Sequence, residues 1–364
     1  MKWPAWWRSL GCRYPLHHGR QAKEMTRVAF DVHQKTSTFA YLDLSTRQPV
    51  TGRLLTNHQE FARLLETLPR PWVVALEATR STPAICAWLR RLGCEIHLVD
   101  PQKLQGLAQA RSAKTDRKDA LLILDALEHG YLPEAYLADP AVQALRELTR
   151  AHRVLVRMGT MLRNLLRGIM ARGGKAIAAT DLCGAAAGEE LLQWLAVADE
   201  PSNIIGALYL SLLQQVRLAV AAVDAQIKHQ AADNPLAQEL ISQPGKGLLT
   251  TLGMLAELGD LARFEGAKQA VSYSGLAPSV QQSGEKCRTG RLPQRCNKHL
   301  RYWAVMCAQS AARSRCPSRA RDAYQRVKRR HGANAGKIAA AREIIKDVYY
   351  AYQRLNQPAA ASAA

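Results

Sequence analysis

The chain has 364 residues, enough for two or three domains that each bury a core of their own. A hydrophobic content of 48% excludes a wholly disordered protein, and the absence of any run of about 18 apolar residues argues against a transmembrane helix. Fifty Lys and Arg against thirty Asp and Glu give a net charge of +20, so nucleic acid is the first partner to consider and an anionic membrane surface the second.

Residues 1–25 are basic and contain three tryptophans, but they lack the apolar core of a signal peptide. We expect them to form a disordered arm. None of the eight cysteines forms a Cys-x-x-Cys pair, which disfavours a zinc ribbon. Reduced, mostly buried thiols are expected instead, as in a cytoplasmic protein.

An α/β pattern extends from Arg27 to about Leu127. Apolar runs bounded by polar residues predict strands, and spacings of three and four predict helices. The predicted strands are 27–32, 36–44, 50–55, 72–77 and 95–99, and the predicted helices between them are 60–68 and 83–92. Three strands, a helix, a strand, a helix, a strand and then helices is the order expected of a ribonuclease-H-like sheet, in which strand ends and a late helix converge on one metal site.

Four carboxylates in this region are poorly explained by packing. Asp31 interrupts the apolar run of the first strand, and Glu77 follows the apolar run of the fourth. Asp116 and Asp119 lie three residues apart where a helix begins. Asp116 could instead cap that helix and Asp119 could pair with a neighbouring basic residue, but burying Asp31 or Glu77 without a partner would be costly.

Carboxylates from three elements can hold two divalent ions about 4 Å apart, which is the arrangement used for phosphodiester cleavage. The sequence therefore predicts that these four acids bind Mg²⁺ or Mn²⁺. Asp100 and Asp125 are competing candidates, although Asp100 precedes Pro101 and is better explained as a turn residue.

From about Pro140 the chain is predicted to be helical. Apolar residues recur at intervals of three, four or seven from Leu145 to Ile169, and again from Ile204 to Ile227. Two long helices with such stripes pack on each other or on another subunit. The Gly/Ala-rich segment 173–188 between them is predicted to be a loop. We interpret residues 140–235 as a helical connector and a candidate oligomerisation element.

Residues 236–357 are predicted to form a mainly helical third domain, followed by a disordered tail over 358–364. The sequence Pro244-Gly245-Lys246-Gly247 opens a helix over 248–258, as in helix-hairpin-helix DNA-binding elements, although Pro-Gly also begins many ordinary helices. Residues 281–332 contain fourteen Lys and Arg and two acids, a local net charge of +12, which predicts nucleic-acid binding. The candidate contacts are Lys286, Arg288, Arg291, Lys298, Arg301, Arg326, Lys328, Arg329 and Arg330.

Several short motifs follow one another in a specific order. They are Asp31 at a strand end, Glu77-Ala78-Thr79, the segment Lys114 to Ala120, the Pro-Gly-x-Gly helix start, Ser274-Gly275-Leu276-Ala277-Pro278, Ser283-Gly284, and Asn297-Lys298-His299-Leu300-Arg301. In their order and spacing, from about Arg27 to Tyr352, the chain resembles the insertion-sequence-110 transposases and the related Piv-type DNA invertases. Arg80, where relatives often have glycine, and Lys246, where they commonly have an apolar residue, depart from the pattern.

The resemblance implies a RuvC-like metal domain over 26–139 with an Asp-Glu-Asp-Asp set, a helical linker, and a C-terminal domain with a nucleophilic serine. The serine of the family's Ser-Gly motif matches Ser283, with Ser274 as the alternative; by itself, Ser-Gly is commonest in plain turns. The resemblance also implies a structured guide RNA transcribed from the element itself. It further implies dimers or tetramers in which the metal domain and the serine come from different subunits.

The sequence thus predicts an α/β plus α protein that acts in the cytoplasm as an RNA-guided transposase of an insertion sequence, cutting and religating donor and target DNA. A RuvC-like junction nuclease that uses metal ions alone would need the four carboxylates but no serine. A nucleic-acid-binding descendant without activity would need neither, and the intact carboxylates and Ser-Gly motif argue against it.

Overall fold

The computed structural model describes residues 25–79, 81–108, 115–176, 181–232, 234–283 and 286–356. The predicted arm, apart from residue 25, and the predicted tail lie outside this range, as do Arg80, Lys114 and Gly284. The chain divides into two compact units, residues 1–137 and 138–364, and each is described by itself.

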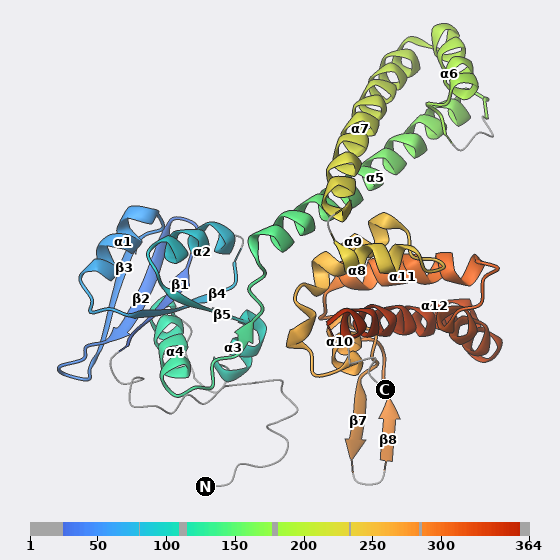
Figure 1. Ribbon diagram of the computed structural model, residues 1–364. Helices are drawn as coiled ribbons and strands as arrows, with labels where there is room; N and C mark the ends of the chain where they lie inside the picture. The colour runs from blue at the N-terminus through green and yellow to red at the C-terminus, as the bar shows by residue number, and fades with distance from the viewer. Residues whose placement is uncertain are drawn as a thin grey trace. The chain divides into compact units, whose positions relative to one another are not determined.

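The N-terminal unit contains a six-stranded mixed sheet in the order β3-β2-β1-β4-β5-β6 (Figure 1). The strands are β1 (Thr26–Val32), β2 (Thr36–Leu42), β3 (Pro49–Leu55), β4 (Trp72–Glu77), β5 (Glu95–Val99) and β6 (Glu134–Ala135). The first three run antiparallel to one another, β4 and β5 continue parallel to β1, and β6 pairs antiparallel with β5. The five predicted strands are confirmed; the two-residue β6 is too short to leave a pattern in the sequence.

Four helices cover the sheet: α1 (His58–Glu66), α2 (Thr82–Arg91), α3 (Pro101–Ala108) and α4 (Asp116–Glu128). Alternate residues of β1 point to opposite faces, as a strand requires. Phe30 packs with Phe61 of α1 and Ile85 of α2, whereas Ala29 packs with Ile123 of α4. The next odd-numbered position of β1 therefore lies on the α4 face of the sheet.

The C-terminal unit begins with a long helical hairpin. Helix α5 (Pro140–Arg172) packs along α7 (Glu200–Ala232), and α6 (Ala185–Val197) closes the end of the pair (Figure 1). Leu166, Leu191 and Leu213 are fully buried or nearly so in its core. The two predicted long helices are confirmed, but the end of the predicted loop over 173–188 is helical, because its alanines favour a helix from Ala185 onward.

Among the described helices, α7 alone is long and apolar enough to cross a membrane by length and composition. The sequence expectation of no such helix rested on uninterrupted apolar runs, whereas α7 reaches this composition with isolated polar residues between its apolar ones. Leu210, Leu213 and Val216 of α7 are buried in the hairpin core, whereas other apolar side chains of the helix are exposed, among them Leu208, Leu212 and Leu218.

The remainder of the C-terminal unit surrounds one large core. Its elements are α8 (Pro235–Ile241), α9 (Leu248–Leu258), the 3₁₀ helix η3 (Leu261–Arg263), α10 (Ala267–Tyr273), β7 (Val280–Ser283), β8 (Lys286–Thr289), α11 (Lys298–Arg313) and α12 (Arg319–Asn356). Leu252, Trp303 and Ile344 from three of these helices meet in the core. Helix α12 is kinked at Gly332, whose φ is 82°.

The Pro-Gly-Lys-Gly turn has a packing role in this structure. Gly245 has a φ of 80°, and a Cβ atom there would lie 2.6 Å from the Ala311 backbone, so only glycine fits against α11. Lys246 is 5% exposed and its Nζ lies 3.2 Å from the Asp347 carboxylate. The predicted helix start is thus confirmed. Lys246 is buried and paired with Asp347.

Candidate metal centre and serine hairpin

Asp31 lies on the α4 face of β1 and is only 4% exposed. Helix α4 begins beside it with Thr115 as its N-cap, whose side chain accepts a hydrogen bond of 3.3 Å from the Lys118 amide. Asp116 is therefore the first residue of the helix and not its cap, and Asp119 follows one turn later. The sequence alternative of Asp116 as the cap is excluded.

His33 joins the two aspartates. Its Nε2 lies 3.2 Å from an Asp31 carboxylate oxygen and 3.6 Å from one of Asp116. One potential ligand atom from each of the three residues falls within 4.8 Å of the others. His33 was not among the residues predicted from the sequence, although its position two residues after Asp31, on the same side of an extended segment, was the available signal.

Electrostatics link Asp119 to the same cluster. Burial raises the pKa of the Asp31 carboxyl, His33 lowers it, and the negative charges of Asp119 and Asp116 raise it further. The balance leaves the pKa of Asp31 above its usual value. Arg53 of β3 donates a hydrogen bond of 3.0 Å to Asp116. A buried carboxylate surrounded by further acids is a site that gains from an additional positive charge, so these residues fit a divalent ion.

The sheet register places Glu77 beside Asp31. Strands β1 and β4 are parallel with Phe30 opposite Leu76, so Asp31 and Glu77 are the next residues along the two strands. Alternation puts Glu77 on the same face as Ala75, which packs toward α4. Its participation in metal binding stays a prediction.

The competing acids have local partners. Asp100 accepts a hydrogen bond of 3.3 Å from the Lys103 amide at the start of α3, in agreement with its interpretation as a turn residue. Asp125 lies 3.1 Å from His129 and also accepts a hydrogen bond from the Tyr131 hydroxyl.

A cavity of about 540 Å³ opens beside Asp116. It is lined by Thr38, Thr51, Gly52, Arg53, Thr115, Asp116 and Arg117. Two arginines on its wall can hold anionic groups close to the carboxylates.

Ser283 is the last residue of β7, and its backbone pairs with Lys286 at the start of β8. It therefore stands at the turn end of the β7–β8 hairpin (Figure 1). Ser274, the alternative serine, is fully buried. Its hydroxyl donates a hydrogen bond of 2.6 Å to the Val271 carbonyl and accepts one of 3.3 Å from the Leu276 amide. The Ser274 hydroxyl thus links the last turn of α10 to the backbone of the turn that follows.

Two family models match the chain. One, described as a transposase of the DEDD type of IS110, covers residues 28–173, and the other, described as the transposase IS116/IS110/IS902 family, covers residues 237–325. The chain belongs to the IS110 family of transposases. It is accordingly a DNA transposase, as its sequence predicted.

Curated relatives agree with this assignment. The IS110-family transposase is 26% identical to a probable family 20 transposase of Pseudomonas aeruginosa over 83% of this chain and 88% of that protein. It is 24% identical to the transposase for IS1328 of Yersinia enterocolitica over 69% of this chain and 73% of that one. It is 27% identical to the transposase for IS1111A of Coxiella burnetii over 61% of each chain.

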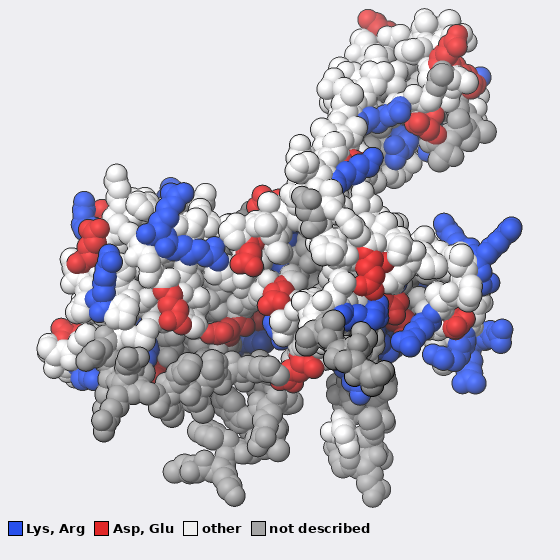
Figure 2. All heavy atoms as spheres, viewed as in Figure 1, with Lys and Arg blue, Asp and Glu red and all other residues white. Residues whose placement is uncertain are grey.

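The transposase carries its basic tract on the hairpin and on α11 and α12. Figure 2 shows Lys and Arg side chains gathered over the ends of α11 and α12. Exposed members of the predicted set are Arg291, Lys298, Arg326, Lys328, Arg329 and Arg330, and the backbones of Lys286 and Arg288 lie in β8. Arg301 instead donates hydrogen bonds of 2.7 and 2.6 Å to the carbonyls of Gly275 and Pro293, so its guanidinium is engaged by the fold.

Proposed function

We propose that this transposase cuts and religates DNA with a metal centre held by Asp31, Glu77, Asp116 and Asp119 and a nucleophilic Ser283. The observation that carries the proposal is the buried Asp31 carboxylate, which meets Asp116 and His33 on the α4 face of the sheet. A carboxylate this deeply buried among other acids is better explained by a bound cation than by packing.

The strand order supports a ribonuclease-H-like, RuvC-like assignment for the N-terminal unit. Three antiparallel strands lead into two parallel ones, and the sheet is covered on both faces by helices. In such a sheet, carboxylates from β1, β4 and α4 lie close together. A metal centre held by residues 31, 77, 116 and 119 requires this arrangement.

Mg²⁺ or Mn²⁺ bound by these acids would polarise the scissile phosphate and stabilise the negative charge on the leaving oxygen. The chain's own contribution is positioning. Asp31 is fixed within a central strand, while Arg53 and Arg117 line the adjacent cavity, where they can hold the DNA backbone.

Ser283 lies at the turn end of the β7–β8 hairpin, and we assign to it the attack on DNA. The serine oxygen would form a bond to phosphorus while the phosphorus–oxygen bond to one DNA strand breaks and that strand leaves as a hydroxyl. The phosphoserine ester retains the energy of the broken bond, so a second strand's hydroxyl can reverse the step and religate. Ser274 is poorly suited to this attack, because its hydroxyl is buried and donates a hydrogen bond within the fold.

The exposed basic tract supports binding of donor and target DNA. We extend the proposal to a structured guide RNA from the element and to a dimer or tetramer, because the family resemblance implies both. Sequencing of RNA that copurifies with the transposase tests the guide, since a transcript from the DNA flanking the gene is expected and random cellular RNA would contradict it.

Trapping of the covalent intermediate tests the catalytic proposal. Reactions with the wild type should contain protein joined to DNA through an alkali-sensitive phosphoserine, and Ser283→Ala and Asp116→Ala should give neither the adduct nor recombination. Ser310→Ala, at an exposed serine of α11, is the matched control and should behave as the wild type.

The alternatives predict other results. A junction nuclease that uses metal ions alone would still cleave as Ser283→Ala and would form no adduct in any version. An inactive nucleic-acid-binding descendant would bind DNA without cleaving it in every version, including the wild type.

A further inference from the structure

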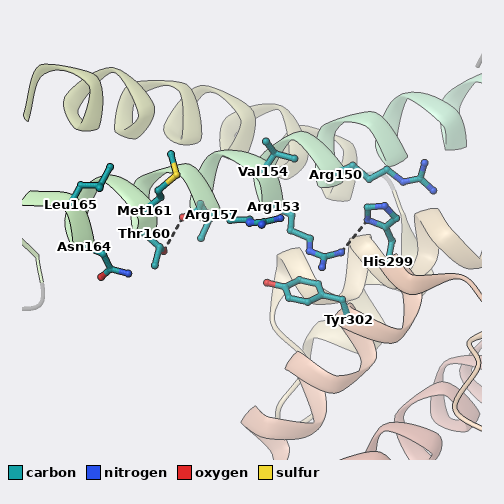
Figure 3. Close-up of a pocket in the computed structure, with 11 residues that line it drawn as sticks. Arg150, Arg153, Val154, Arg157, Thr160, Met161, Asn164, Leu165, His299 and Tyr302 are labelled. Carbon is teal, nitrogen blue, oxygen red and sulfur yellow. Dashed lines mark hydrogen bonds between the residues drawn. The ribbon is translucent and has the colours of Figure 1, made fainter. Parts of the chain in front are cut away.

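A second, distinct cavity of about 850 Å³ lies within the C-terminal unit, between the middle of α5 (residues 150–165) and the start of α11 (Figure 3). Arginines of α5 form one wall, and His299 and Tyr302 of α11 form the other. None of the described residues that line this groove is acidic. It lies outside the basic tract of residues 281–332 except for its two α11 residues.

Four arginines lie along one face of α5 and differ in whether they have partners within the fold. Arg146, Arg150, Arg153 and Arg157 are spaced by four, three and four residues, which aligns them on a helix. Arg146 donates hydrogen bonds to the carbonyls of residues 256 and 257, and Arg150 makes a bidentate pair of 2.7 and 2.8 Å with the fully buried Glu257. The guanidinium groups of Arg146 and Arg150 therefore already have partners within the protein.

The next two have no carboxylate partner among the residues that the structure describes. The Arg153 guanidinium lies 3.9 Å from the centre of the Tyr302 ring, and its NH1 donates a hydrogen bond of 3.3 Å to Nδ1 of His299. Arg157 is exposed one turn further along the groove. Their charges remain available to an external anion.

His299 can donate a hydrogen bond to an anion in the groove as a neutral imidazole. Burial lowers its pKa, Arg150 lowers it as well, Glu257 raises it, and Arg153 lowers it again, with a net fall below the usual value. Because Nδ1 accepts from Arg153, the proton of the neutral ring lies on Nε2. Thr160 and Asn164 add further hydrogen-bonding groups along the same wall (Figure 3).

We propose that this groove binds the sugar–phosphate backbone of a nucleic-acid strand. The proposal rests on the function proposed above for the class of partner, and it adds a contact site on α5. Charges of one sign with no acid nearby match a polyanion, and planar guanidinium groups suit phosphate oxygens. An aromatic ring and exposed apolar side chains at Val154, Met161 and Leu165 offer surfaces to sugars and bases.

The length of the groove favours a polymer over a small anion. From Arg153 to Asn164 the helix rises by about 16 Å. A duplex strand advances about 3.4 Å per nucleotide, so several successive nucleotides fit beside α5.

The experiment measures binding by the full-length protein in EDTA, using a labelled DNA duplex, a single DNA strand and an RNA stem–loop over a range of salt concentrations. In Arg153→Gln/Arg157→Gln, the slope of log affinity against log salt should fall by about 1.8 on duplex or about 1.4 on single strands. The probe that loses slope identifies whether DNA or RNA occupies the groove. Arg157→Gln alone should lose about half as much.

Arg63→Gln/Arg91→Gln makes the same change in charge at exposed positions of α1 and α2 and should keep the wild-type slope. Unchanged slopes on all three probes, with both groove variants folded, would overturn the proposal. A shift from oligomer to monomer with unchanged slopes would also overturn it and assign the groove to a contact between copies.

The binding experiment and the adduct experiment can fail independently of each other. Binding in EDTA requires neither metal ions nor the covalent step, so it reports on the groove even in a preparation that cannot recombine DNA. Absence of recombination together with the expected loss of slope would refute the proposed chemistry while leaving the groove intact.

Discussion

At the scale of single residues, Asp31 and Ser274 show that burial decides what a polar side chain can do. Asp31 is 4% exposed and lies among other acids, so its charge is unfavourable until a cation offsets it. Ser274 is equally buried, but both hydrogen bonds of its hydroxyl are made within α10 and the turn that follows. One buried polar group therefore points to a ligand and the other to a local structural role.

Asp31→Asn should increase the free energy of unfolding in metal-free buffer at neutral pH, by on the order of 1 kcal/mol. The pKa of Asp31 in the folded protein is raised by burial above its unfolded value, so the ionised group costs stability at any pH above both values. Mg²⁺ should stabilise the wild type and not the variant. Urea unfolding with EDTA or Mg²⁺ measures both effects.

Asp43→Asn is the matched control with the opposite sign. Hydrogen bonds from the Ser45 hydroxyl, the Thr46 amide and the Ser45 amide lower the pKa of this exposed carboxyl to about 2, so its removal should reduce stability. Destabilisation by Asp31→Asn in EDTA, or equal stabilisation of wild type and variant by Mg²⁺, would contradict the metal assignment.

Ser274→Ala should lower the free energy of unfolding by about 1 kcal/mol, because it removes two buried hydrogen bonds at the end of α10. At a temperature where it remains folded, it should still form the covalent DNA adduct. Thermal unfolding and adduct trapping measured on the same preparation check both statements. Loss of the adduct in a stable Ser274→Ala protein would transfer the nucleophile assignment from Ser283 to Ser274.

At the scale of elements, α4 and α5 each present charge along one face. Helix α4 starts at a threonine cap and projects two acids from its first turn toward β1. Helix α5 uses its first arginines to attach to α9 and leaves later ones exposed. Glu257 is central to that attachment, since it accepts hydrogen bonds from Arg150 and from Asn297, the N-cap of α11.

Glu257→Gln should lower the free energy of unfolding at neutral pH by about 1–3 kcal/mol, because it weakens a buried, charge-assisted pair. Burial alone would raise the pKa of Glu257, but hydrogen bonds from Arg150 and Asn297 lower it below the usual 4.5. Its contribution to stability is therefore complete above the unfolded pKa and is lost as the pH falls through the folded pKa.

Chemical unfolding over a pH series tests this prediction. The wild type should lose stability below about pH 4.5 more steeply than Glu257→Gln. Glu147→Gln, at an exposed glutamate of α5, should follow the wild type. Parallel pH profiles for wild type and Glu257→Gln would show that the pair contributes little.

At the scale of the whole molecule, the acidic cluster and the exposed basic residues lie in different units of the chain. The net charge of +20 coexists with an acidic cluster in the N-terminal unit, while the C-terminal unit carries exposed basic residues on α11 and α12. An overall positive field attracts DNA from a distance, and the acidic cluster is where the cations of the proposed mechanism would bind.

Reversing Arg326, Lys328, Arg329 and Arg330 to Glu should weaken binding to all DNA sequences alike. The slope of log affinity against log salt should fall by about 0.9 for each phosphate of duplex DNA that these side chains neutralise in the wild type, because counterion release scales with the number of phosphates neutralised. Titrations of specific and scrambled DNA over a salt series measure this. If the slope stays at the wild-type value, these side chains contact water alone.

The sequence by itself determined the order of strands and helices, the family and three of the residues brought together at β1 and α4. It did so because period-two and period-3.6 patterns are local, and because an acid inside an apolar run contradicts its surroundings. Asp31, Asp116 and Asp119 could therefore be chosen before their arrangement was known. Tertiary structure alone decided that His33 bridges Asp31 and Asp116, that Arg301 holds backbone carbonyls, and that arginines of α5 meet Tyr302. Such contacts depend on how distant elements pack, and local spacing carries no record of that packing.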